Sequence, residues 1–135
     1  MQFNIDNSSG RAVYQQIIDQ IKRDIAMGKL LAGEKLPTVR ELAVQLVINP
    51  NTIAKAYRQL EQEGIITTRP GAGAFVAQMS SNLSRAVKKK MICERLELAA
   101  VEAIHMQIDK KTFGEWFENV LKKFKFSQDQ GKSNE

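Results

Sequence analysis

The chain has 135 residues, 43% of them hydrophobic and 26% charged, which is enough apolar material for a packed core and excludes a disordered chain. This length fits one domain of ordinary size or two very small ones. A single cysteine and a single histidine exclude an internal disulfide and a cysteine–histidine zinc cluster. No apolar stretch reaches the roughly 18 residues of a membrane span, and the first residues lack the features of a secretory signal. We therefore expect a soluble cytoplasmic protein with no membrane association, and the formal net charge of +5 favours an anionic partner.

The first half of the chain has the apolar periodicity of three helices. Residues 12–27 carry an isoleucine-rich stripe at helical spacing and end before a glycine. Thr38 and Glu41 have the spacing of a capping box and open a second helix, which ends near residue 47. Asn49 suits an N-cap and Pro50 suits the first position of a third helix, which runs to about residue 63. Two helices with such a short connection are typical of a helix-turn-helix.

A β-hairpin is predicted after the third helix. Residues 65–69 are rich in β-branched side chains and favour a strand, residues 70–73 favour a turn, and residues 74–77 favour the returning strand. Three helices followed by a two-stranded hairpin are the element order of a winged helix-turn-helix. We therefore expect residues 1–77 to form a DNA-binding domain of this type, followed by a polar linker at residues 78–83.

The remainder of the chain favours two helices with more apolar surface than they can bury against each other. The first is expected over residues 84–108, the second is expected to begin at a capping box of Thr112 and Glu115, and residues 127–135 are expected to be a flexible tail. Because each large apolar side chain contributes roughly 1.5–3 kcal/mol when buried, we expect residues 84–126 to form an obligate homodimer. The side chains expected at the dimer interface are those of Val87, Met91, Leu98, Val101, Phe113, Trp116, Phe117, Val120 and Phe124.

The outward positions of the third helix carry the residue types that contact a DNA major groove. These positions are Asn51, Thr52, Lys55, Arg58, Gln59 and Gln62. Amides and hydroxyls suit base edges, and cations suit phosphates or guanine. An ordinary solvated helix face uses the same residue types, so composition leaves both interpretations open, and the adjacent turn and hairpin favour DNA binding. We expect Arg40 and the start of the third helix to read bases, and Arg58 and Arg69 to contact the DNA backbone.

No pattern for catalysis or cofactor binding is found in the sequence. It lacks a nucleophile–base constellation, a phosphate-binding glycine loop and a metal-ligand motif, so we expect neither an enzyme nor a bound cofactor or metal. The two C-terminal helices of one chain are not expected to enclose a small-molecule pocket. An effector, whose identity is unknown, would bind between subunits or between domains.

Five blocks of sequence together resemble the GntR family of bacterial transcription regulators. The blocks are residues 14–17, 33–43, 49–57, 60–64 and 71–76. The short C-terminal part and the Asn-Pro-Asn-Thr turn at residues 49–52 are similar to the YtrA subfamily. The resemblance implies a homodimeric DNA-binding regulator, typically a repressor. The residues that it places at the DNA are Arg40, Asn49, Asn51, Thr52, Lys55, Gly71 and Gly73.

Two positions depart from the pattern of this family. Many GntR proteins have an arginine in the turn where this chain has Pro50, so that base contact is not carried over. Many members also carry a cation between the two wing glycines and a threonine after them, whereas this chain has Ala72 and Ala74. The tip of the predicted wing is therefore neutral.

The sequence thus predicts a mainly α protein with a small β-hairpin, in which an N-terminal winged helix-turn-helix precedes a short helical dimerisation region. The expected function is transcriptional repression by a homodimer bound to a pseudo-palindromic double-stranded DNA operator. Two alternatives are a winged-helix protein-interaction adaptor and a non-specific architectural DNA binder. The polar, partly basic face of the third helix argues against the adaptor, and a net charge of +5 is modest for the architectural protein.

Overall fold

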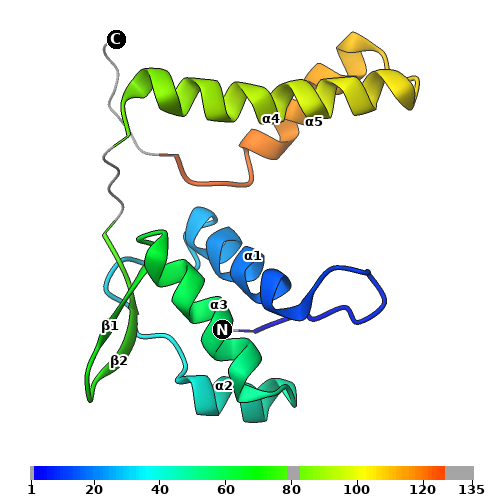
Figure 1. Ribbon diagram of the computed structural model, residues 1–135. Coiled ribbons are helices and arrows are strands. Elements are labelled where there is room, and N and C mark those ends of the chain that lie inside the picture. Colours follow the sequence, from blue (N-terminus) through cyan, green and yellow to red (C-terminus); the bar gives the residue numbers. More distant parts are fainter. Residues whose placement is uncertain (1, 79–82, 127–135) are drawn as a thin grey trace. The chain divides into compact units, whose positions relative to one another are not determined.

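The computed structural model describes residues 2–78 and 83–126. The elements are α1 (Val13–Ala26), α2 (Val39–Leu46), α3 (Pro50–Gln62), β1 (Ile66–Arg69), β2 (Gly73–Val76), α4 (Arg85–His105) and α5 (Lys110–Leu121), shown in Figure 1. They form two compact units, one containing α1 to β2 and the other containing α4 and α5. The mainly helical fold with a small hairpin confirms the predicted fold class. Most of the expected linker and the whole of the expected tail lie outside the described residues.

The first unit is built around α3, which packs against α1, α2 and β1. All four inward positions of α3 that the apolar period predicts are buried. The side chains with no exposed surface in this core include Ile17, Ile18, Ile21, Leu42, Ile53 and Leu60. Each contributes roughly 1.5–3 kcal/mol by leaving water, so this three-helix core holds α3 firmly in place.

Two local capping motifs determine where α2 and α3 begin. At α2, the Thr38 hydroxyl accepts a hydrogen bond from the Glu41 amide at 3.0 Å, and the Glu41 carboxylate accepts one from the Thr38 amide at 2.9 Å. At α3, the Asn49 side-chain oxygen accepts a hydrogen bond from the Asn51 amide at 2.8 Å, and Pro50 occupies the first turn. Both predicted starts are confirmed. The turn between the helices passes through Val47, which has a left-handed backbone with φ 56°.

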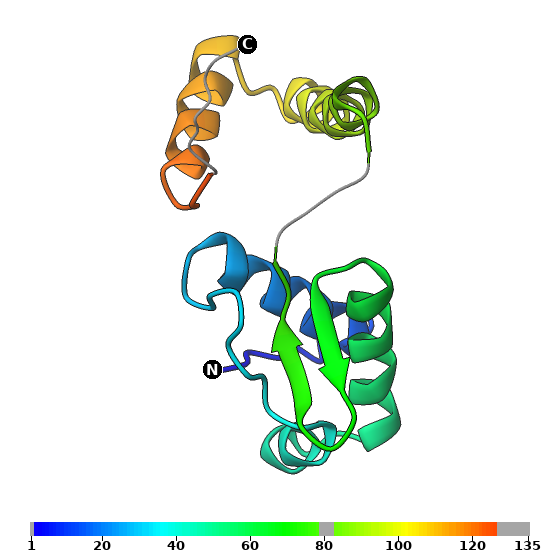
Figure 2. The same ribbon diagram turned by 90° about the vertical axis from the view of Figure 1, so that its left-hand side faces the viewer.

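The hairpin is antiparallel and carries a third segment on its outer edge. β1 and β2 pair in a register that places Ile66 opposite Val76 and Arg69 opposite Gly73. Residues 33–36 run along the other edge of β2 (Figure 2), where the Gly33 amide donates to the Val76 carbonyl at 2.8 Å and the Leu36 amide donates to the Ala74 carbonyl at 2.8 Å. The segment before α2 is therefore attached to the hairpin by backbone hydrogen bonds.

In the second unit the start of α5 differs from the prediction. Asp109 is the N-cap, because its carboxylate accepts hydrogen bonds from the Thr112 amide at 3.1 Å and the Thr112 hydroxyl at 2.7 Å. The helix therefore begins at Lys110, and the predicted capping box of Thr112 and Glu115 is wrong. Thr112 donates to the cap instead of forming it, so the predicted N-cap lies three residues too late in the chain.

The two helices of this unit do not close on each other. An open hollow of about 430 Å³ lies between them, with Leu96 and Ala100 of α4 on one side and Phe113 and Phe117 of α5 on the other. This hollow is open, so the expectation that these two helices of one chain do not enclose a small-molecule pocket stays a prediction.

Candidate nucleic-acid interface

The beginning of α3 presents the polar side chains that were predicted to read bases. Asn51 is exposed and Thr52 is half-buried in the first turn of the helix. The capping bond to the Asn51 amide orients the Asn49 side chain at the helix start. The first turn of a helix also carries unpaired backbone N–H groups, which attract anions such as phosphate. This end of α3 therefore suits the surface of a nucleic acid.

Two of the predicted cations are held against aromatic rings. The Lys55 ammonium lies 3.9 Å from the centre of the Tyr14 ring on α1, and the Arg69 guanidinium lies 4.2 Å from the centre of the Phe75 ring on the hairpin. Such contacts contribute about 0.5–1 kcal/mol at exposed sites and limit the positions that a long side chain adopts. Arg40 and Arg58 are exposed on α2 and α3. The four cations therefore come from three different elements of one unit.

A buried tyrosine joins α3 to the start of α2. The Tyr57 hydroxyl donates a hydrogen bond of 2.6 Å to the Pro37 carbonyl oxygen, one residue before the α2 cap. Burial raises the pKa of the Tyr57 hydroxyl, and the nearby Glu41 carboxylate raises it further, so the group remains a donor at all physiological pH values. Sequence reasoning found Tyr57 only as an inward-facing residue. No local signal connects it with a carbonyl twenty positions away.

Two further polar contacts hold the neighbouring elements on α3. The Thr68 hydroxyl on β1 donates to the Glu61 carboxylate at 2.6 Å, and the Lys22 ammonium on α1 lies 2.6 Å from the Glu63 carboxylate. The hydrogen bond from Lys22 is the main cause that lowers the pKa of Glu63. The hairpin and α1 are thereby both connected to the same helix.

The hairpin glycines lie beside the start of α2. A hollow of about 330 Å³ is lined by Thr38 and Tyr57 together with Arg69, Gly71 and Gly73. Both glycines have positive φ values, +77° and +112°, which side-chain-bearing residues rarely adopt. The structure therefore brings three of the predicted wing residues together at the end of the hairpin.

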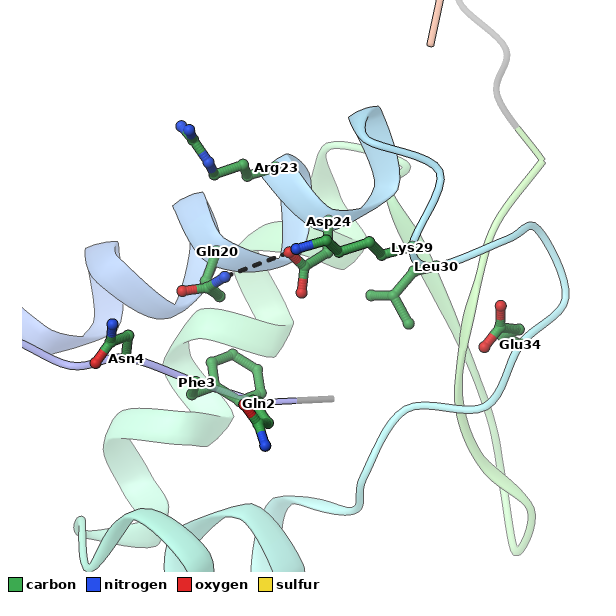
Figure 3. A pocket seen from close by; sticks show the side chains of 9 residues that line it. All are labelled: Gln2, Phe3, Asn4, Gln20, Arg23, Asp24, Lys29, Leu30 and Glu34. Carbon is green, nitrogen blue, oxygen red and sulfur yellow. Dashed lines mark hydrogen bonds between the residues drawn. The ribbon is translucent and has the colours of Figure 1, made fainter. Parts of the chain in front are cut away.

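A second hollow of the same unit, of about 790 Å³, holds none of the residues predicted to contact DNA (Figure 3). Its walls come from the N-terminal segment, the end of α1 and the loop that follows. Asp24 is only 6% exposed there, and its carboxylate accepts a hydrogen bond of 3.3 Å from the Gln20 side chain. This hollow is therefore separate from the candidate interface.

Two other classes of site are absent from the described part of the chain. Within residues 2–78 and 83–126, no group of three or more histidine, cysteine, aspartate or glutamate side chains could hold a metal ion. Of the helices that these residues form, none is both long and apolar enough to cross a membrane.

The fold and the exposed residues together define a class of protein. A helix-turn-helix with a polar and cationic second helix, followed by a hairpin wing, is a DNA-binding winged helix-turn-helix. Residues 13–76 match the model of the bacterial regulatory proteins of the gntR family. The chain is also 37% identical to the HTH-type transcriptional repressor YtrA of Bacillus subtilis (strain 168) over 116 residues, which cover 86% of this chain and 89% of that protein. The chain therefore belongs to the GntR family of DNA-binding transcriptional regulators, and its likeness to the YtrA subfamily is confirmed.

Solved structures agree with this assignment. A transcriptional antiterminator from Listeria monocytogenes EGD-e matches 97% of this chain and 98% of its own, with a TM-score of 0.80 and 27% identity. The structure described as AraR(DBD) in complex with operator ORX1 matches 57% of this chain and 99% of its own, with a TM-score of 0.50 and 29% identity. Relatives of this chain are transcriptional regulators, which are not enzymes.

Proposed function

We propose that this protein is a transcriptional repressor that binds a pseudo-palindromic operator as a homodimer. The start of α3, with Asn51 and Thr52, enters the major groove and reads bases together with Arg40. Arg58 and Arg69 contact the DNA backbone. The exposure of Asn51 and of the three arginines around a rigid, capped helix supports this assignment, as does the repressor name of the Bacillus subtilis relative.

The observation that carries the homodimer is an apolar face of α4 that α5 leaves uncovered. Leu96 and Ala100 line the hollow beside α5. The opposite face of α4, by helical spacing, carries a second apolar stripe. This stripe consists of Val87, Met91, Leu98 and Val101, which are between 43% and 67% exposed. Monomeric soluble proteins rarely expose a contiguous apolar surface of this kind, so the stripe favours burial in an interface.

The last helix, α5, also exposes large apolar side chains that favour burial in an interface. Trp116 is 52% exposed, and Phe117 and Val120 are exposed as well. A second copy of the same segment covers these side chains on both chains at once, which is the arrangement of a two-fold symmetric dimer. Such a dimer carries two recognition helices and reads two half-sites about one DNA turn or a multiple of it apart.

The dimer is tested by lowering the net charge by one on either face of α5. Trp116→Asp places a carboxylate in the apolar stripe, and we expect it to dissociate the dimer in sedimentation experiments and to abolish tight operator binding. Lys111→Gln lowers the net charge by the same amount at an exposed position that helical spacing places on the opposite side of α5, and it is expected to leave both properties unchanged. Circular dichroism checks that the winged unit stays folded. A stable monomer of the unmodified chain at micromolar concentration would contradict the proposal.

Sequence-specific binding is tested by comparing two kinds of duplex at one fixed salt concentration. The operator is selected from a pool of random duplexes, and its affinity is compared with that of an unselected duplex. A specific regulator binds its operator about 10³-fold or more tightly than random DNA. Equal affinities would instead favour the architectural DNA binder, and the absence of binding to either duplex would favour the protein-interaction adaptor.

A further inference from the structure

The outer face of the wing carries a cation that does not belong to the hairpin. In the antiparallel register, Ile66, Ala74 and Val76 point into the core, so Gly73 and Phe75 lie on the opposite face. The tip of the hairpin between the two glycines has only the methyl group of Ala72. Arg69 at the end of β1 is the one cation of the hairpin residues 66–76, so any further positive charge on the wing comes from another part of the chain.

Lys35 lies against this outer face. Its backbone forms a bridge to Phe75, within the segment that runs along the edge of β2. A Cβ atom at Gly73 would lie 3.1 Å from Cε of Lys35 and 3.8 Å from its Nζ. The glycine therefore leaves the space through which the lysine side chain passes across the strand. The backbone hydrogen bonds of residues 33–36 hold the start of this side chain in place.

Arg69 places a second cation on the same outer face of the hairpin. It pairs with Gly73 in the hairpin register, and its guanidinium lies over the Phe75 ring. Within the described residues, neither Lys35 nor Arg69 forms an ion pair with a carboxylate. The hydrogen bonds from Thr38 lower the pKa of the Glu41 carboxyl most, and the charge of Lys35 lowers this pKa by a smaller amount. Two neighbouring cations repel each other, and an anion between them removes that repulsion.

We propose that Lys35 supplies the cationic group of the wing and, together with Arg69, binds a backbone phosphate of the operator. The inference rests on the proposed function, since it assigns a further DNA contact to the same interface. A lysine contacts phosphate as a point charge and carries no sequence information. Lys35 therefore contributes to affinity for every duplex and to the position of the wing, and it does not contribute to base discrimination.

The test measures how binding depends on salt. Each phosphate neutralised by the protein adds about −0.9 to the slope of log K against log salt concentration on duplex DNA. For Lys35→Gln we expect a slope that is less negative by roughly 1.8, because the variant removes one lysine from each of the two subunits, with the same fold-loss of affinity on the operator and on a random duplex. Lys29→Gln removes the same charge at an exposed position that lines the separate hollow of Figure 3, and its slope is expected to equal that of the unmodified protein. A rescue variant adds Ala72→Lys to Lys35→Gln, and is expected to restore the slope because it returns a cation to the wing tip.

The outcomes separate this inference from the function on which it rests. If the unmodified protein binds no duplex, the proposed function fails. If it binds its operator and Lys35→Gln keeps the same slope as Lys29→Gln, the phosphate contact is overturned while the function stands. A loss of affinity confined to the operator would also overturn it, because that result indicates base readout. If Ala72→Lys does not restore the slope, Lys35 does not stand in for a wing cation.

Discussion

Replacing Val47 by glycine is expected to make this protein more stable. Val47 ends α2 in the left-handed region with φ 56° and ψ 52°, where a β-branched side chain crowds the backbone. For ordinary residues this conformation costs roughly 1–2 kcal/mol, and glycine adopts it freely. The valine side chain is 89% exposed, so its removal loses almost no burial. Glycine also increases the entropy of the unfolded chain, which costs about 0.4–1 kcal/mol, so the net gain in stability is roughly 0–1.6 kcal/mol.

The matched control for Val47→Gly is Val44→Gly. Val44 is also exposed, at 75%, but it lies inside α2, where glycine costs about 1 kcal/mol relative to good helix formers. Urea denaturation of the full chain at one fixed protein concentration compares the two, because the stability of the proposed dimer would depend on concentration. The midpoint should rise for Val47→Gly and fall for Val44→Gly at unchanged slope. If both variants lose stability equally, the reasoning from backbone strain is refuted.

Three further predictions concern α2 and its contacts. Arg40→Ala should weaken operator binding by about 1–3 kcal/mol and relax discrimination at one base position, and equal weakening on random DNA in an anisotropy assay would contradict base readout. Tyr57→Phe should lower the free energy of unfolding by about 1 kcal/mol, because the Pro37 carbonyl loses its donor, and urea midpoints measure the loss. The bonds from Thr38 lower the pKa of Glu41, so the stabilisation by this carboxylate is complete above the unfolded pKa and is lost as the pH falls through the lower folded pKa. Glu41→Gln should therefore lose less stability than the unmodified protein as the pH falls. If the variant loses as much stability on acidification as the unmodified protein, the capping carboxylate does not cause that loss.

The sequence alone determined the elements of the winged unit and their starts, because these depend on interactions within one helical turn. The capping box of Thr38 and Glu41 and the Asn49 cap before Pro50 each need only a few neighbouring residues. The inward face of α3 follows from the helical period alone. At the start of α5 the predicted capping box of Thr112 and Glu115 is wrong, because Asp109 is the cap and Thr112 donates to it.

Tertiary structure decided which distant residues meet. Lys35 and Gly73 are far apart in the chain, and only the pairing of residues 33–36 with β2 brings them together. The Tyr57 hydrogen bond to Pro37 and the position of Lys55 over Tyr14 likewise join separate elements. Apolar periodicity predicts which face of a helix is buried but does not predict what covers that face, because hydrophobic burial is non-directional. For the same reason the sequence predicted the apolar excess of α4 and α5, whereas only the packed structure shows that one chain leaves it uncovered.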